Sequence, residues 1–180
     1  MKKAIITIAF AIIAVLSFAQ SAPLGSRTQL VEVKEYNNVY SVFTYKDYYG
    51  SSEYDLSLGH NINELINEIC IYLGITNDEA IDSIGYLIGM FSNGIGTTAL
   101  FKCRVSTDSD KLSDYKNIKC MVVKRRILGK CISFQYETDK GTVETYMTKS
   151  SLKMLRKGLD RKSTRLNSSH IATSRMPSSA

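Results

Sequence analysis

The sequence is poor in histidine and proline, with two of each among 180 residues. One histidine, His170, lies in a C-terminal segment that is set aside below, so His60 is the single histidine of the main chain. No two cysteines are spaced as C-x-x-C, and with one histidine we expect neither a zinc site nor a cofactor. The shortage of proline excludes a proline-rich linker, and no internal repeat is present. These absences favour a single domain.

The last 21 residues, Asp160 to Ala180, are predicted to be translated sequencing-adapter DNA. Back-translation of 160–170 and of 174–180 fits the two arms of an adapter used for short-read libraries, in order and in one frame. Residues 171–173 occupy the place of a sample index. The alternative is a disordered, serine-rich basic tail. A read-through segment carries no information about the natural fold, so we expect the natural chain to be truncated near Leu159.

Met1 to Ala19 has the pattern of a bacterial-type signal peptide. Lys2 and Lys3 form a positively charged n-region, and an apolar run follows over Ala4–Leu16. Small residues then precede a cleavage position after Ala19. The run is shorter than the roughly 20 residues of a spanning helix. We therefore expect export to the periplasm or the medium, and no transmembrane helix in the mature chain.

The net charge of +6 falls once both terminal segments are removed. Residues 20–159 contain 17 basic and 16 acidic side chains, a net charge of +1. A near-neutral chain does not favour nucleic acid as a partner. Its 140 residues are enough for one domain with its own core.

All four cysteines lie in this mature region. An even number in an oxidising compartment favours disulfides, with three possible pairings, while four buried free thiols are the alternative. The residues concerned are Cys70, Cys103, Cys120 and Cys131.

The first part of the mature chain predicts a hairpin, a loop and two helices. Residues 30–46 form the hairpin, which turns at Asn37-Asn38 so that Val33 faces Val42. Residues 48–60 are polar and are predicted to be the loop. One helix begins at a cap on Asn61 and follows apolar residues at helical spacing as far as residue 73. The other is capped by Thr76 with Glu79 and ends at Gly94.

The later part of the chain predicts about four strands, over 98–105, 118–127, 130–137 and 142–148, and a final helix capped by Ser150. The expected fold is therefore α+β. It is a single small domain in which a mainly antiparallel sheet packs with two central helices and a truncated C-terminal helix.

Three tyrosines of the predicted loop, Tyr48, Tyr49 and Tyr54, are candidate binding residues. Exposed tyrosines provide rigid contact surface for glycans and proteins, while cross-strand packing is the alternative. Lys124, Arg125 and Arg126 are a candidate anion-binding patch, with a solvated strand end as the alternative.

No complete catalytic constellation is present, so we favour an exported, non-catalytic binding protein. Its ligand would be a glycan, a peptide or an envelope partner. A small exported hydrolase that uses His60 is a second hypothesis. A structural component of the envelope is the third.

Overall fold

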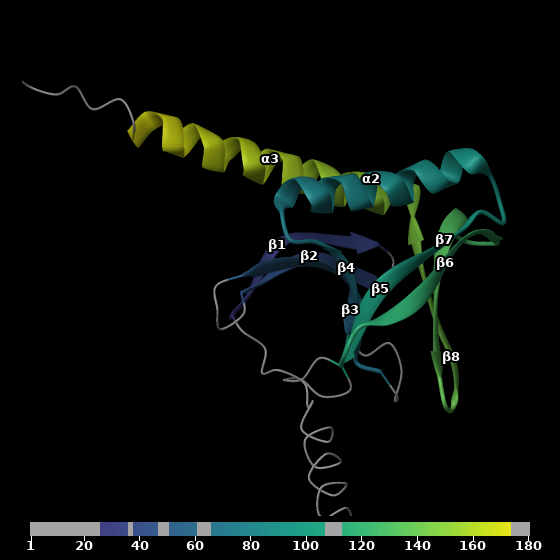
Figure 1. The fold of residues 1–180 in the computed structure, drawn as a ribbon. Coiled ribbons are helices and arrows are strands. Elements are labelled where there is room, and N and C mark those ends of the chain that lie inside the picture. Colours follow the sequence, from purple (N-terminus) through teal and green to yellow (C-terminus); the bar gives the residue numbers. More distant parts are fainter. Residues whose placement is uncertain (1–25, 36–37, 47–50, 61–65, 107–112, 174–180) are drawn as a thin grey trace, which may run out of the picture.

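Eight strands of the described chain form one antiparallel sheet in which each strand pairs with the next along the sequence (Figure 1). The computed structural model describes residues 26–35, 38–46, 51–60, 66–106 and 113–173, with the backbone alone for Ser26, His60 and residues 162–173. The strands are β1 (Ser26–Glu35), β2 (Asn38–Lys46), β3 (Ser52–His60), β4 (Glu68–Gly74), β5 (Thr98–Ser106), β6 (Lys116–Arg125), β7 (Gly129–Thr138) and β8 (Gly141–Thr148). Helix α2 (Asn77–Asn93) separates β4 from β5, and α3 (Lys149–Thr173) follows β8.

The predicted fold with two central helices is wrong, because the sheet is larger than the sequence suggested. Most of the predicted loop over 48–60 is β3, and the second part of the predicted helix over 61–73 is β4, since residues 68–74 are extended. Residues 61–65 lie outside the described chain. One helix, α2, therefore stands where two were expected.

Strand β4 was misassigned because it is buried on both faces. Ile69, Ile71 and Leu73 pack in the main core, while Glu68 and Cys70 are buried on the opposite face. A short apolar run of this kind satisfies a helical and a strand pattern equally well. The isoleucines, whose branched side chains suit a pleated surface, favour the strand.

The predicted N-terminal hairpin is present, but its register differs by two residues. Val33 pairs with Tyr40 and Val31 pairs with Val42, whereas the sequence predicted that Val33 would face Val42. Because the side-chain period of a strand is two, this shift leaves the same residues on the core face.

Helix α2 confirms the predicted cap at Thr76, but the Glu79 carboxylate bonds to the amide one residue before the one that a capping box uses. The Thr76 hydroxyl accepts a hydrogen bond from the Glu79 amide at 3.2 Å, and the Glu79 carboxylate accepts one from the Ile75 amide at 2.7 Å. At the other end Lys130 of β7 donates to the carbonyl of Phe91. This places a positive charge where the helix dipole is negative.

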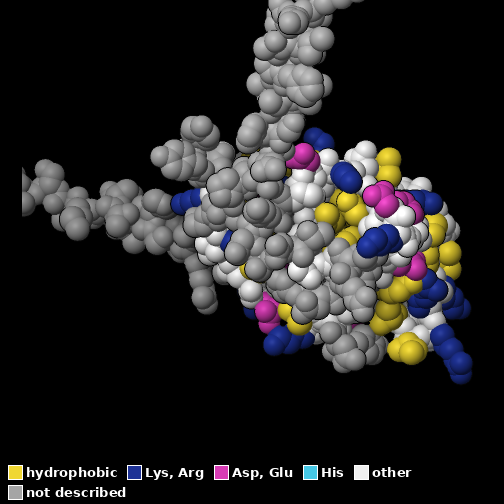
Figure 2. All heavy atoms as spheres, turned by 90° about the horizontal axis from the view of Figure 1, so that it is seen from below, with side chains coloured by type: hydrophobic (Ala, Val, Ile, Leu, Met, Phe, Trp, Pro, Cys, Tyr) yellow, Lys and Arg dark blue, Asp and Glu magenta, His cyan; other side chains and the backbone are white. Residues whose placement is uncertain are grey.

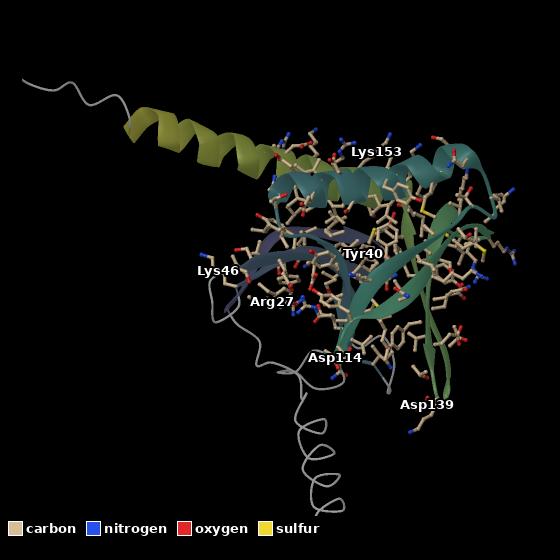
Figure 3. All side chains as sticks on the ribbon, viewed as in Figure 1. Arg27, Tyr40, Lys46, Asp114, Asp139 and Lys153 are labelled. Atoms are coloured by element: carbon tan, nitrogen blue, oxygen red, sulfur yellow. The ribbon has the colours of Figure 1, made fainter. Side chains whose placement is uncertain are left out.

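The main core lies between the sheet and the two helices, on what we call the inner face (Figures 1 and 3). Its fully buried members include Val42, Leu56, Ile71, Ile118 and Phe134 from the sheet. Strand neighbours in sequence point to opposite faces. The opposite side, which we call the outer face, therefore carries Phe43, Asp55, Cys70, Arg104 and Ser133.

Polar contacts of two residues, Tyr40 and Glu35, join the beginning of the sheet to its end. Tyr40 of β2 donates a hydrogen bond to the carbonyl of Tyr146 on β8. Glu35 of β1 accepts hydrogen bonds from the hydroxyls of Thr148 and Ser151, each at 2.6 Å. Thr148 also accepts from the Ser151 amide at 3.3 Å, so the helix cap is Thr148, two residues before the predicted Ser150, and α3 begins at residue 149.

Candidate functional site

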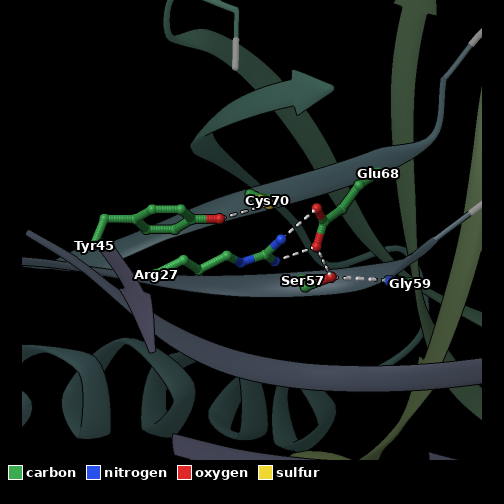
Figure 4. A network of polar contacts seen from close by, with 6 residues as sticks. All are labelled: Arg27, Tyr45, Ser57, Gly59, Glu68 and Cys70. Atoms are coloured by element: carbon green, nitrogen blue, oxygen red, sulfur yellow. Dashed lines mark hydrogen bonds and ion pairs between the residues drawn. The ribbon is translucent and has the colours of Figure 1, made fainter. Parts of the chain in front are cut away.

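The outer face carries a buried polar network in which side chains of β1, β3 and β4 contact one another (Figure 4). Arg27 donates to both carboxylate oxygens of Glu68, one of them at 3.0 Å. Ser57 donates to Glu68 at 2.5 Å and accepts from the amide of Gly59 at 3.3 Å. The Glu68 side chain is 4% exposed, so this ion pair is shielded from water. Charged partners in such a setting attract each other far more strongly than at a surface.

Aromatic side chains of β2 surround the guanidinium group of this pair. The guanidinium carbon of Arg27 lies 3.5 Å from the ring centroid of Phe43 and 5.4 Å from that of Tyr45. The Tyr45 hydroxyl lies 3.8 Å from the Cys70 sulfur. Burial raises the pKa of Tyr45 and of Cys70, so both remain neutral at physiological pH.

Asp55 lies beside this network and is fully buried. Neither of its carboxylate oxygens has a hydrogen-bond partner among the described residues. Its cross-strand neighbours are Phe43 and Tyr72, which are aromatic. Burial, with a smaller contribution from Glu53, raises the pKa of Asp55 to about 7, against a smaller lowering by Arg27. A carboxyl group that titrates near neutrality in this way is typical of functional sites.

A second aromatic group adjoins Asp55 on the side of β5. Arg104 forms an ion pair with Glu53, and its guanidinium carbon lies 4.0 Å from the ring centroid of Tyr115. Tyr115 donates to Glu53 at 2.9 Å and meets the ring of Tyr72 edge to face at 5.5 Å. The Tyr115 residue is 39% exposed, so this group reaches the surface. Burial lowers the pKa of Arg104.

In the candidate anion patch, the structure pairs the middle residue with a carboxylate. Arg125, at the end of β6, contacts Glu144 at 3.0 Å and lies 4.4 Å from the ring centroid of Tyr146. Lys124 and Arg126 are exposed on either side of it. The middle charge of the predicted patch is therefore already paired with a carboxylate.

The three candidate tyrosines do not form one described surface. Tyr48 and Tyr49 lie outside the described residues. Tyr54 lies within β3 and not in a loop, and it packs half-buried against the main core on the inner face. Burial raises its pKa, with a smaller contribution from Asp78.

His60 is the last residue of β3, and its backbone pairs with Glu68 of β4. Its side chain lies outside the described part of the structure.

All four cysteines are buried as free thiols. Cys103 and Cys120 belong to the main core, whereas Cys70 lies on the outer face. Burial is the largest cause of a raised pKa at each of these three and at Cys131, so none is a ready thiolate nucleophile.

Within the described ranges, no group of three or more histidine, cysteine or acidic side chains could hold a metal ion. Among the helices that the structure describes, none combines the length and apolar character needed to span a membrane. Comparison with protein-family models, curated proteins and solved structures finds no match to this chain.

Sequence reasoning missed Arg27, Asp55 and Glu68. The available indication was the alternation in β3, where Asp55 and Ser57 interleave with Leu56 and Leu58. Such alternation predicts a strand with a polar face, but it cannot show that the polar face is buried.

Proposed function

We propose that this chain is an exported, non-catalytic binding protein whose ligand binds the outer face around Asp55. The observation that supports this is the buried Asp55 carboxyl group, which has no hydrogen-bond partner in the described chain. Leaving a buried polar group unpaired costs about 1–3 kcal/mol, and more for a charge. A ligand that donates hydrogen bonds to Asp55 would recover that energy on binding.

The surroundings of Asp55 favour a glycan over a peptide or an envelope protein as the ligand. Tyr72 is a cross-strand neighbour of Asp55 and contacts the partly exposed ring of Tyr115, and Glu53 and Arg104 supply further polar groups. Sugars present hydroxyl donors together with apolar ring faces, which suits aromatic side chains beside a carboxylate.

Titration calorimetry would test the proposal with three probes: the tetramers of β-1,4-linked N-acetylglucosamine and of β-1,4-linked glucose, and tetraalanine. A ligand that donates to Asp55 prefers the ionised carboxylate, whose population rises through the pKa of about 7. We therefore expect one of the sugars to bind about ten times more tightly at pH 8 than at pH 6.

The variant Asp55→Asn should weaken this binding at least tenfold and remove its pH dependence. Asp114→Asn is the matched control, because Asp114 is an exposed acid next to Tyr115 in sequence. Sugar binding that Asp55→Asn leaves unchanged, or tetraalanine as the one probe that binds, would contradict the proposal.

One observation favours the second hypothesis, a hydrolase that uses His60. The backbone of His60 pairs with that of Glu68, whose carboxylate already accepts from the Ser57 hydroxyl. Hydroxyl, carboxylate and imidazole are the groups of a serine hydrolase. Hydrolysis of p-nitrophenyl acetate that is lost in both His60→Ala and Ser57→Ala would support it, and equal rates in all three proteins would exclude it.

A further inference from the structure

The sheet divides between β4 and β5 (Figure 1). These strands pair from Glu68 opposite Ser106 as far as Ile71 opposite Cys103. Beyond that point β4 continues beside β3, and residues 98–102 of β5 continue beside β6. In the described part of the chain, no strand pairs with residues 98–102 on the side away from β6.

The backbone of this segment presents unused hydrogen-bonding groups. The carbonyl groups of Thr97 and Val105 point toward the β6 side, where they accept from the amides of Val122 and Ser113 at 2.9 Å each. Successive residues of a strand point in opposite directions. The N–H and C=O groups of Thr98, Leu100 and Lys102 therefore point away from β6, toward the open side. In the described chain no strand pairs with Thr98 or Leu100 on that side, whereas Lys102 adjoins the last β4–β5 pair, Ile71 opposite Cys103.

The side chains along this edge differ between the two faces of the sheet: they are aromatic on the inner face, and apolar and basic on the outer face. On the inner face the rings of Phe101 and Tyr86 lie 5.9 Å apart, and Tyr86 is 60% exposed. On the outer face Leu100 is 70% exposed, and Lys102 and Lys119 are exposed nearby, since Lys119 is the register partner of Leu100. Figure 2 shows basic, acidic and hydrophobic side chains next to one another on the uncovered part of the outer face.

We propose that residues 98–102 of β5 bind an extended peptide segment of another protein, in which acidic residues alternate with apolar ones. The peptide adds a strand to the open edge. Its apolar side chains pack against Tyr86 and Phe101, and its acidic side chains face Lys102 and Lys119. A second copy of this chain fits less well, because pairing two identical edges brings basic residues together on one face. This inference does not depend on the ligand of Asp55.

The experiment measures fluorescence anisotropy of the full chain with a labelled heptapeptide, VEVEVEV. The charge-reversed peptide VKVKVKV is one control, and VEVEVEV with N-methyl groups on alternate residues is the other. We expect VEVEVEV to bind and both controls to fail, because one reverses the charge and the other blocks the backbone donors of one edge.

Two variants test the site itself. Lys102→Glu with Lys119→Glu should weaken VEVEVEV binding at least tenfold, whereas Lys124→Glu with Lys140→Glu, which changes the net charge equally, should leave it within twofold. Leu100→Pro should abolish binding with the circular dichroism spectrum unchanged, because proline removes an N–H that points to the open side.

Three outcomes would overturn the inference. The first is no binding of VEVEVEV at millimolar concentration. The second is binding that the Lys102 and Lys119 reversal leaves within twofold. The third is a dimer in sedimentation velocity that Leu100→Pro dissociates, which would assign the edge to a second copy of the chain.

Discussion

The two halves of the sheet each carry a cluster of the same four types of polar side chain on the outer face, in which an arginine and a serine contact one glutamate and a tyrosine lies beside the guanidinium. In the first half Arg27 pairs with Glu68, Ser57 donates to the same carboxylate at 2.5 Å, and Tyr45 lies beside the guanidinium. In the second half the corresponding residues are Arg125, Glu144, Ser133 and Tyr146, and Ser133 also donates to its carboxylate at 2.5 Å.

The two clusters differ in exposure. The side chains of Arg27 and Glu68 are 25% and 4% exposed, against 46% and 28% for Arg125 and Glu144. Exposed ion pairs contribute about 0–1 kcal/mol, because water and salt weaken the attraction. Breaking a buried pair by removing one partner costs about 3–5 kcal/mol, because a charge is left without compensation. The same chemistry should therefore matter for stability in one half of the sheet and little in the other.

The largest expected difference comes from removing the two arginines. Arg27→Met should lower the free energy of unfolding by about 3–5 kcal/mol, because Glu68 is left buried without its partner. Arg125→Met should lower it by less than about 1 kcal/mol. Urea unfolding of both variants measures the difference, and equal losses would show that burial does not distinguish the clusters.

The next effect concerns pH, because Asp55 lies in the first half and has no described counterpart in the second. Its pKa is raised from 3.8 to about 7, by burial first and then by Glu53 and Glu68, against the lowering by Arg27. The folded chain therefore binds more protons than the unfolded chain between these values, and stability falls as pH rises from about 4 to about 7. At about 1.4 kcal/mol per pKa unit, the fall is at most about 4 kcal/mol.

The variant Asp55→Asn should remove most of this decline and exceed the parent chain in stability at pH 8. Urea unfolding at pH 4.5, 6 and 8 measures the slope for both proteins, with Asp114→Asn as the exposed control. A parent chain whose stability is flat across this range would show that Asp55 titrates at its ordinary pKa.

A smaller effect is expected from the two serines. Ser57→Ala should cost about 1.5–3 kcal/mol, because it removes a hydrogen bond to a charged, buried acceptor. Ser133→Ala should cost less, about 0.5–1.5 kcal/mol, because Glu144 is partly exposed and also accepts from Gln135 at 3.2 Å. Thermal unfolding of the pair measures this, and a reversed order would contradict the comparison.

The smallest effect is the response to salt. A double-mutant cycle on Arg125 and Glu144 should give a coupling energy of about 0.5 kcal/mol that disappears in 1 M NaCl, where the Debye length is about 3 Å. The cycle on Arg27 and Glu68 should keep most of its coupling energy, since burial protects the pair from screening. Loss of both couplings in salt would place both pairs at the surface.

The sequence predicted the second half of the chain much better than the first. Strands β5 to β8 and the capped helix α2 lie close to their predicted ranges, because each has turn or capping residues that define its ends. Strands β3 and β4 were missed because their polar residues are buried. Asp55 and Ser57 suggested an exposed loop, while the isoleucines of β4 also matched helical spacing.

The candidate site could not be assembled from the sequence, because its members are far apart along the chain. Arg27 and Glu68 are 41 residues apart, and no local pattern indicates that β1 and β4 bring them together. The two clusters contain the same four residue types, and this likeness can be recognised only once the strand register is known.

The contacts of Glu35 have a consequence for the order of folding. A sheet in which each strand pairs with its sequence neighbour can form progressively during synthesis, since every new strand finds its partner already in place. The hydrogen bonds of Glu35, by contrast, can form only after Thr148 and Ser151 have been synthesised, more than a hundred residues later. Until then a carboxylate at the end of the first strand lacks its native partners, so these hydrogen bonds form only when nearly the whole domain has been made.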